Sequence, residues 1–545
     1  MTLNKRAAFF CQKLLLLIVA SYLVGCASQQ KPQGGPKDRT PPKLLKSSPP
    51  NMTRNFKEKQ IRLDFDEYFN LKNPFQEITI SPAPEKLPSY KASKKTIVVD
   101  FKDSLQKNTT YVINFGKAIA DVNEGNIVPN FTYVFSTGSH IDSLSVSGSV
   151  LNTLTQEKEK DVTVMLFPVK QDTLFGKKKP SIYASTDSSG NFSLNNLHDG
   201  DYRIYALKEA APNKIYDNEN ELVAFQKEPI HLDKDTSGIR LSLFKQDPEK
   251  VRLIERRFDA DGKMFFTFNK GIVNPSVKIL YPAALDQQKL VDFSKTRDTA
   301  SIYMRSMDFD SIRVSFLENN KPLDTIALRK GRKETFTRTL ALLYNTTFDN
   351  KLKPNTDLIV TVNSPIESFD SSIITLNEDS TNVSNYTITK DSSMKRLTVK
   401  YKWKQNSRYQ IIFNDGSLTG IYGDKIKKAL KVFQVDKIDN YGALNLKINI
   451  PDTSKAYVVE LLNDQKKVVR TDPVRKSGLV VYTDFPVGKY NVRVTYDSNK
   501  NGKWDSGNVK QKRQPENIWL YSKDLTVRAN WEAEEPIDIP KEPNP

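Results

Sequence analysis

Residues 61–65 read Ile-Arg-Leu-Asp-Phe, and this strict alternation of apolar and polar side chains decides the class of fold. A period of two residues places the three apolar side chains on one face of a β-strand, whereas a helix would need a period near 3.6. Ile97–Phe101 and Tyr111–Phe115 continue the pattern less cleanly. These stretches predict half-buried strands and therefore an all-β fold.

Length and composition agree with several β domains in one chain. The 545 residues include 28 Phe and 22 Tyr, and Asn, Asp, Ser and Pro recur between short apolar runs. Aromatic strands separated by turn residues are typical of β-sandwiches, and a chain of this length exceeds one ordinary domain.

The first folded segment, 41–138, carries further motifs after its Pro-rich start. These are Leu63–Glu67, Leu105–Tyr111, Asp121–Asn126 and Tyr133–Gly138. Together they resemble the bacterial Ig-like domain named after the surface-layer protein SbsA. The resemblance implies a spacer or interaction sandwich without catalytic residues.

The same outline returns later in the chain. Its clearer copy, 344–437, repeats the earlier stretches in order and spacing through Leu358–Val362, Leu397–Tyr401, Asn406–Phe413 and Gly420–Asp424. A divergent copy is predicted at 247–343. Asp64, Asp66 and Glu67 of the first copy do not predict a catalytic carboxylate pair, because strand alternation points Asp64 and Asp66 outward and the later copy lacks these acids.

A second type of module is predicted at 139–246. Val162–Phe167 predicts a buried strand, Thr186–Leu194 predicts two strands around a turn at Gly190, and Gly200-Asp201-Tyr202 follows. The pattern is similar to carboxypeptidase-regulatory-like or prealbumin-like β-sandwiches. It returns at 438–531, where we match Gly478–Tyr482, Gly488–Tyr490 and Pro515–Trp519 to Gly190–Leu194, Gly200–Tyr202 and Lys227–His231.

The amino-terminal segment predicts export and anchoring. Lys5, Arg6 and Lys13 accompany an apolar run, Leu14–Ala20, that is too short to span a bilayer comfortably. Leu23-Val24-Gly25-Cys26 then resembles the lipobox of bacterial lipoproteins. The resemblance implies a signal peptide (1–25) cleaved between Gly25 and Cys26, and a lipid on the Cys26 thiol; an uncleaved signal anchor is the alternative.

Composition shifts at both ends complete the domain plan. Residues 26–40 are rich in Gln, Gly, Pro and Lys and predict a flexible tether, whereas the acidic, Pro-rich segment 532–545 predicts a disordered tail. The resemblance to lipoproteins implies the outer membrane of a Gram-negative envelope. A periplasmic rather than exterior orientation is favoured, because no acidic run follows Cys26.

Cysteine content and charge limit the chemistry. Cys11 lies in the predicted signal peptide, so the mature chain would have neither a disulfide nor a cysteine nucleophile, and the three histidines lack ligand spacing. The net charge of +18 favours anionic partners. Given the resemblance to a lipobox, these would be phospholipid headgroups, lipopolysaccharide or acidic glycans rather than nucleic acid, and other envelope proteins are further candidate partners. The alternative is that lysines only solvate strand faces.

One loop resembles a cation site. Asp497, Asn499, Asn501 and Asp505 alternate around Gly502, as oxygen ligands do in calcium loops. The twelfth position is Asn508 rather than the Glu such loops use. Calcium is therefore the one candidate cofactor, and an Asx-rich structural turn is the alternative.

A recurring triplet, Asp followed by Ser or Thr and then usually an aliphatic residue, resembles an O-glycosylation sequon of some Gram-negative envelope proteins. The candidate hydroxyls belong to Ser104, Ser143, Thr173, Thr299, Ser311, Thr325 and Ser380. The alternative is that Asp-Ser and Asp-Thr merely start turns before strands.

No motif for nucleophilic, phosphate-binding or metalloprotease chemistry occurs, so the chain is not expected to be an enzyme. We predict a non-catalytic envelope lipoprotein, a rod of sandwiches acting as spacer, scaffold or interaction protein. A glycan-binding lipoprotein that stacks sugars on Trp403, Trp504 or Trp519 is the alternative. A hydrolase would need a clustered acid, base and nucleophile.

Overall fold

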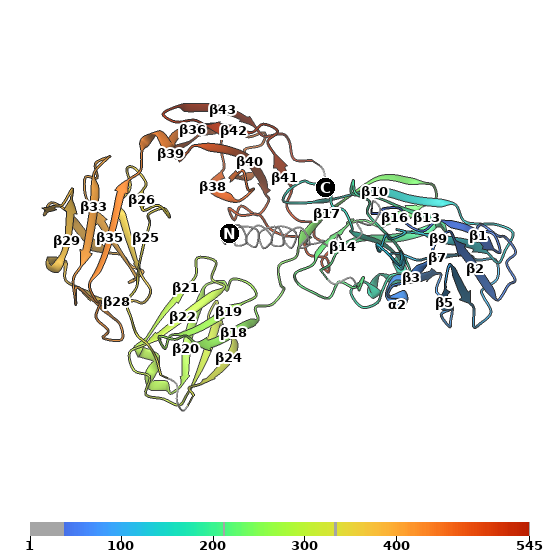
Figure 1. Cartoon of the computed structure of the whole chain (residues 1–545), viewed down its shortest axis with the longest axis horizontal. Coiled ribbons are helices and arrows are strands. Elements are labelled where there is room, and N and C mark those ends of the chain that lie inside the picture. The colour runs from blue at the N-terminus through green and yellow to red at the C-terminus, as the bar shows by residue number, and fades with distance from the viewer. Residues whose placement is uncertain (1–36, 211–212, 332–334, 544–545) are drawn as a thin grey trace, which may run out of the picture. The chain divides into compact units, whose positions relative to one another are not determined.

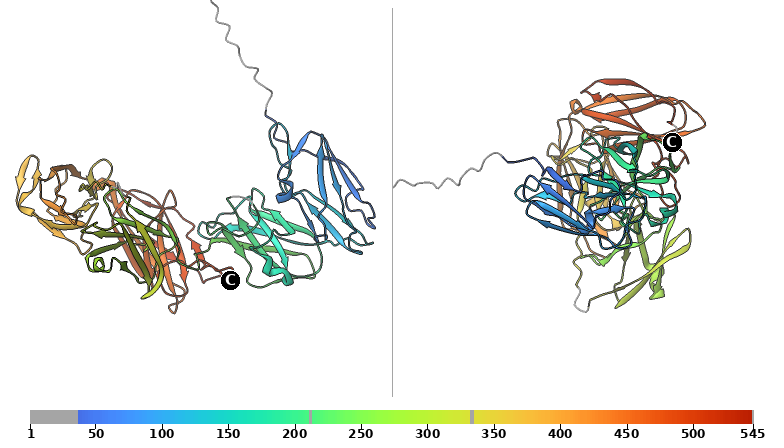
Figure 2. Two further views of the ribbon diagram at one scale, coloured as in Figure 1. Left: turned by 90° about the horizontal axis from the view of Figure 1, so that it is seen from below. Right: turned by 90° about the vertical axis from the view of Figure 1, so that its right-hand side faces the viewer.

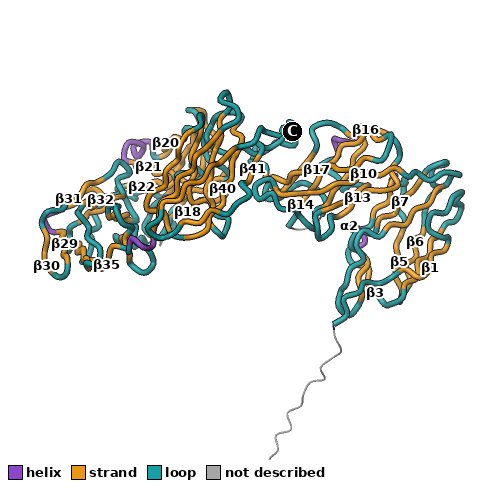
Figure 3. The backbone as a smooth tube through the Cα atoms, turned by 90° about the horizontal axis from the view of Figure 1, so that it is seen from above, coloured by secondary structure: helices purple, strands orange, loops and turns teal. Residues whose placement is uncertain are grey.

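The computed structural model describes residues 37–210, 213–331 and 335–543 (Figure 1), and its strands confirm the all-β prediction. Strands run along the whole described chain, with short helical segments between them (Figure 3). None of the helices in this part of the chain is long and apolar enough to span a membrane. Contacts divide the chain into two units at Asp142 and Ser143.

Module 1 forms the described part of the first unit and is a sandwich with its own core. Its sheets have the orders β1-β2-β6-β5, β4-β7-β9 and β3-β8. The apolar side chains of 61–65 all point into the core, as predicted, where Tyr111 stacks on Phe135 with ring centroids 5.4 Å apart. The elements are β1 (Leu44–Ser48), β2 (Gln60–Phe65), β3 (Phe69–Leu71), α2 (Pro74–Glu77), β4 (Thr79–Ser81), β5 (Ser89–Ser93), β6 (Thr96–Asp100), β7 (Thr110–Asn114), β8 (Ile119–Asp121) and β9 (Thr132–Ser136).

Module 2 opens the second unit with β10 pairing antiparallel to β13 and parallel to β17. Gly148 permits the close approach of β10 to β17, since a Cβ there would lie 2.0 Å from the Ile239 carbonyl oxygen. Gly190 has φ +71°, as the predicted turn requires. The elements are β10 (Leu144–Asn152), β11 (Thr163–Pro168), η1 (Val169–Leu174), β12 (Ile182–Ser185), β13 (Asn191–Leu197), β14 (Gly200–Lys208), β15 (Leu222–Phe225), β16 (Ile230–Leu232) and β17 (Thr236–Lys245).

Modules 3 and 4 repeat the pairing of module 1. In module 4 the strand order β25-β27-β32-β31 corresponds to β1-β2-β6-β5 of module 1. In module 3 the corresponding order is β18-β19-β22-β21, and a second sheet has the order β20-β23-β24. Module 3 comprises β18 (Leu253–Phe258), β19 (Met264–Phe268), β20 (Pro275–Tyr281), η2 (Ala283–Gln288), β21 (Lys289–Phe293), β22 (Thr299–Met304), β23 (Ser311–Glu318) and β24 (Lys321–Arg329). Module 4 comprises β25 (Leu342–Tyr344), β26 (Lys351–Leu352), β27 (Leu358–Val362), β28 (Ile366–Phe369), η3 (Ser371–Ile373), β29 (Ile374–Glu378), β30 (Thr381–Val383), β31 (Thr387–Lys390), β32 (Arg396–Lys400), β33 (Arg408–Phe413), β34 (Leu418–Gly420) and β35 (Ala429–Val435).

Module 5 repeats module 2 nearly strand for strand: β36 pairs antiparallel with β39 and parallel with β43, as β10 does with β13 and β17. Figure 2 shows the strand groups from two further sides. The elements are η4 (Ile438–Asn440), β36 (Tyr441–Asn449), β37 (Ala456–Asn463), β38 (Val468–Val474), β39 (Gly478–Pro486), β40 (Gly488–Asp497), β41 (Ile518–Leu520), β42 (Leu525–Val527) and β43 (Glu532–Asp538).

Module 5 corrects two sequence-based predictions. The expected disordered tail begins instead with β43, whose Ile537 is fully buried in the module core. β43 is the counterpart of β17, which closes the sheet of module 2. The match of Pro515–Trp519 to Lys227–His231 is also wrong, because β42 pairs with the start of β40 as β16 pairs with the start of β14.

Candidate interaction site

The loop between β40 and β41, residues 498–517, is the docking loop of module 5. Its first turn forms around Asp497, which is 2% exposed and whose carboxylate accepts the backbone N–H groups of Asn501 (3.0 Å) and Gly502 (2.8 Å). Glu516 closes the other end by accepting the N–H groups of Ser498 (2.7 Å) and Asp505 (3.0 Å). The loop is therefore held in shape by bonds within its own module.

The tip of the docking loop packs against module 2. Val509, only 6% exposed, joins a cluster formed by the outer face of the module 2 sheet. Gly507 lies so close to Phe244 that a Cβ would stand 2.5 Å from the ring carbon Cζ. The cluster on module 2 consists of Met165, Phe167, Tyr183, Tyr205, Leu207, Val223, Phe225 and Phe244, with Trp504 of module 5 at its edge.

Polar contacts surround the apolar plug, which is Val509 packed in the apolar cluster of module 2. Gln246 accepts the backbone N–H of Val509 at 2.8 Å, and Ser506 accepts the backbone N–H of Asp247 at 3.0 Å. The amide of Gln514 donates to the Phe225 carbonyl oxygen at 2.7 Å. Two of these bonds satisfy backbone groups of the buried residues Val509 and Phe225, which docking would otherwise leave without a partner.

A charged group completes the contact. The Lys512 ammonium pairs with the Asp172 carboxylate at 3.2 Å and lies 4.7 Å from the ring centroid of Tyr205, whose hydroxyl donates to the same carboxylate. Burial, and then the hydrogen bond to Asp172, raise the pKa of Tyr205, so its hydroxyl stays protonated as a donor.

The periphery of the interface carries weaker pairs. Lys466 pairs with Glu157, Arg493 donates to the Leu154 carbonyl oxygen at 3.3 Å, and Lys510 lies 3.7 Å from Glu249. Solvent-exposed ion pairs contribute about 0–1 kcal/mol each. The apolar plug, rather than these pairs, therefore supplies most of the docking free energy.

The other junctions of the second unit also carry direct contacts. Glu219 of module 2 pairs with Arg252 of module 3, Lys395 of module 4 lies 2.6 Å from Asp292 of module 3, and Asn355 of module 4 donates to Asp484 of module 5 at 3.0 Å. Within this unit each module contacts the next, and module 5 contacts module 2. The sequence did not predict the contact between modules 5 and 2.

The sequence-predicted anchor residues, Gly25 and Cys26, lie outside the described residues. The candidate calcium loop lies in the docking loop, where Asn499 and Asn501 donate to the Asp505 carboxylate at 2.5 and 2.6 Å. Across the described ranges, no three His, Cys, Asp or Glu side chains are grouped to hold a metal ion. The loop is thus closed by its own hydrogen bonds, as in an Asx-rich turn.

The candidate glycosylation hydroxyls are distributed over modules 1 to 4 rather than gathered. Thr299 and Ser311 are half-buried, and Thr299 donates to Asp298 at 3.1 Å. The exposed ones are Ser104, Ser143, Thr173, Thr325 and Ser380.

The three tryptophans considered for sugar stacking serve in packing. Trp403 lies edge-on to Tyr409 and Phe433 in module 4, and Trp519 lies edge-on to Tyr521 in module 5. The indole of Trp504 donates to the Glu516 carbonyl oxygen at 3.0 Å within the docking loop. These rings do not form an open platform for a sugar.

The carboxylates at the end of β2 and just after it take different partners. Asp64 accepts from Thr96 at 2.6 Å and pairs with Arg62 at 3.0 Å, and these contacts lower its pKa. Asp66 accepts the backbone N–H of Lys43 at 2.7 Å. The pair is structural in this arrangement.

Sequence reasoning missed the docking residues, although two signals pointed to them. Val162–Phe167 is apolar at every position except Thr163, and such a strand needs cover on both faces. The docking loop, 498–517, is also longer than its counterpart between β14 and β15, 209–221. An apolar outer face and an extended loop in the paired module are what a contact between copies requires.

Comparison with known proteins finds one family. Residues 38–137 match the model of the bacterial Ig-like domain. No curated protein matches the chain. Module 1 is therefore similar to a known family. The other modules are described by their strand pairing alone.

Similar solved structures include a pilin subunit, a surface layer protein and a macroglobulin. The major pilin subunit of Bacillus cereus is 11% identical over 73% of this chain and 99% of that chain, with a TM-score of 0.14. Domains 1–6 of surface layer protein SbsC are 11% identical over 89% of this chain and 67% of that chain, at 0.14. Alpha-2-macroglobulin from Escherichia coli is 9% identical over 35% and 88%, at 0.17. Such low scores support no inference about module arrangement.

Proposed function

We propose that this chain is a non-catalytic scaffold of the bacterial envelope, held at a membrane by a lipid on Cys26. The observation that supports it best is the docking of module 5 on module 2 through Val509. If each module contacted only the modules before and after it in the chain, the chain could bend at every junction. The contact between module 5 and module 2 instead restrains modules 2 to 5 together. The result is a platform that presents surfaces at fixed separations.

The sequence of the first 26 residues supports the proposed anchor. Acyl chains contribute about 0.8 kcal/mol per buried CH₂, so two or more chains on Cys26 would hold the protein on a bilayer almost permanently. A Gram-negative outer membrane with the modules facing the periplasm is the proposed location. Envelope proteins or anionic glycans are the proposed partners, and module 1 is the proposed SbsA-type spacer between tether and platform.

Zero-length crosslinking tests the platform. A carbodiimide joins amines to carboxylates only in direct contact, so mass spectrometry of the treated protein should find Lys512 joined to Asp172, and Lys466 joined to Glu157. Lys395 to Asp292, between neighbouring modules, is the internal control. Recovery of the control crosslink without the other two would refute the docked platform.

Detergent phase separation tests the anchor separately. Protein from the native host should enter the detergent phase and carry the added mass of the lipid, and the Cys26→Ala variant should lack that added mass. An unlipidated intact mass together with aqueous partitioning of the unmodified protein would refute membrane anchoring without affecting the platform.

A further inference from the structure

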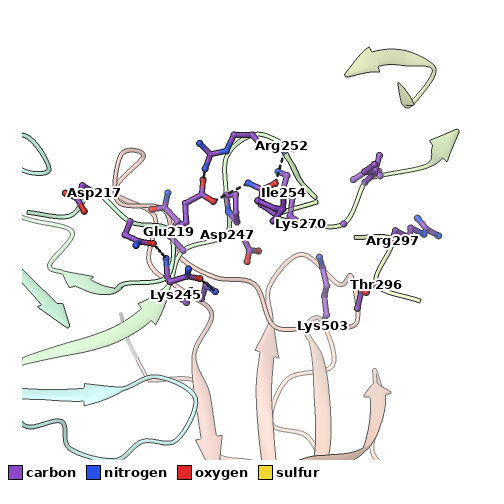
Figure 4. Close-up of a pocket in the computed structure, with 18 residues that line it drawn as sticks. Asp217, Glu219, Lys245, Asp247, Arg252, Ile254, Lys270, Thr296, Arg297 and Lys503 are labelled. Atoms are coloured by element: carbon purple, nitrogen blue, oxygen red, sulfur yellow. Dashed lines mark hydrogen bonds and ion pairs between the residues drawn. The ribbon is translucent and has the colours of Figure 1, made fainter. Parts of the chain in front are cut away.

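A groove of about 980 Å³ lies where modules 2, 3 and 5 meet (Figure 4). Asp217, Glu219 and Lys245 lie on one side of the view, and Thr296, Arg297 and Lys503 on the other. Lys503 belongs to the docking loop, so the groove has its third wall only while module 5 is docked.

The charge lining the groove is positive, because five basic side chains face three acidic ones. Of the acidic side chains, Glu219 is already paired with Arg252. Lys503 is 70% exposed and approaches Asp505 only to 3.8 Å. Arg297 is exposed. Two cations on different modules are therefore available to an anionic ligand.

Arg297 is presented by a preformed turn. The Asp298 carboxylate accepts from the hydroxyls of Ser294 and Thr296, both at 2.8 Å, and the Arg297 carbonyl oxygen accepts the Ile272 N–H at 3.0 Å. These bonds fix the backbone of the turn that carries the Arg297 guanidinium, so ligand binding does not have to order that backbone.

The rest of the lining suits hydroxyl-rich molecules. Asn218, Asn220 and Gln246 supply side-chain amides whose oxygens already accept from the Asn220 N–H, Lys245 and the Val509 N–H, so it is their NH₂ groups that can donate to hydroxyls. Ile254 is 65% exposed at the same groove and offers an apolar surface to the C–H faces of sugar rings. An open groove of this size exceeds what a single small anion would fill.

We propose that this groove binds an acidic oligosaccharide, a chain of sugars carrying carboxylates. Arg297 and Lys503 pair with successive carboxylates, the amides of module 2 bond the hydroxyls, and Ile254 packs on a ring face. The proposal rests on the docked platform proposed above, because Lys503 reaches the groove only in that arrangement.

The test uses the mature full chain and a fluorescein-labelled oligogalacturonate, with a neutral dextran oligosaccharide of similar length as control. Anisotropy should report saturable binding of the acidic probe and none of the neutral one. The double variant Arg297→Gln, Lys503→Gln should weaken binding about tenfold, as loss of two exposed pairs predicts. The matched control Lys295→Gln, Lys500→Gln removes two charges from the same loops outside the groove and should retain affinity within about twofold, since neither side chain lines the groove.

The outcomes separate this proposal from the platform. Absence of probe binding, equal binding of both probes, or equal loss in the two double variants would each overturn the groove proposal. The Lys512 to Asp172 crosslink is measured on the same samples. If the crosslink forms and binding is absent, only the groove proposal fails; if neither occurs, the platform fails and the groove fails with it.

Discussion

Replacing Val509 should undock module 5 without unfolding it. The side chain lies in the apolar cluster of module 2 and is not part of the core of module 5. Val509→Ala removes two carbon groups from that cluster, which costs roughly 1.5 kcal/mol and reduces the docking equilibrium about tenfold. Val509→Asp loses the whole contact, about 2 kcal/mol, and adds the cost of placing a carboxylate among the rings of Phe225 and Phe244.

Small-angle scattering and carbodiimide crosslinking measure the result. The radius of gyration should rise in the order wild type, Val509→Ala, Val509→Asp, and the Lys512 to Asp172 crosslink should decline in the same order. Val481→Asp is the matched control, because Val481 is 50% exposed on the same module. A Val509→Asp protein with wild-type dimensions and an intact crosslink would refute the claim that the apolar plug holds the modules together.

Three further predictions concern other parts of the chain. Burial opposes ionisation of Glu378, but hydrogen bonds from Tyr401, Lys404 and Tyr409 outweigh burial and lower the pKa of this carboxyl below 4.5. The stability that the ionised carboxyl gives module 4 should therefore be present above pH 4.5 and lost as the pH falls through the folded pKa. Hydrogen exchange of β29 between about pH 3 and 6 should show this loss, and Glu378→Gln should remove the pH dependence. Calcium should leave the melting temperature unchanged, because the loop after Asp497 is closed by its own hydrogen bonds; a rise that Asp505→Asn abolishes would instead establish the calcium site. Intact mass of protein from the native host should exceed the lipidated polypeptide by glycans on exposed hydroxyls such as Ser104 and Thr325, and a mass explained by lipid alone would contradict O-glycosylation.

The strands were predictable where one face is buried and one is solvated. In Ile61–Phe65 the apolar residues are buried and Arg62 is exposed, so the period of two is visible in the sequence. β43 was missed because Glu532, Glu534 and Pro536 dominate its composition, while Ile537 alone supplies a fully buried side chain. Its parallel pairing with β36 depends on a partner far earlier in the chain, which local composition does not report.

The docking site was harder to predict for a different reason: it depends on a difference between two copies of one module. At the place in β14 where module 2 has Tyr205, paired with Met165, module 5 has Arg493 in β40, paired with Glu460. The outer face of one sheet is therefore apolar, and the equivalent place on the other is a salt bridge at 2.7 Å. The sequence of each module alone predicts an ordinary β-sandwich. Only a comparison of the two shows that module 2 has an apolar outer face, which must be shielded from water.

This difference also explains why the contact joins module 5 to module 2 and does not extend to further copies. Arg493 holds Glu460 within its own module and donates to Leu154 of module 2, so the equivalent face of module 5 is closed to a second docking loop. Module 2, in turn, has its outer face filled by Val509 and Trp504. One chain supplies both the docking loop and the apolar face that the loop covers, so the pairing saturates within that chain, which is the behaviour a platform needs and a polymerising repeat would lack.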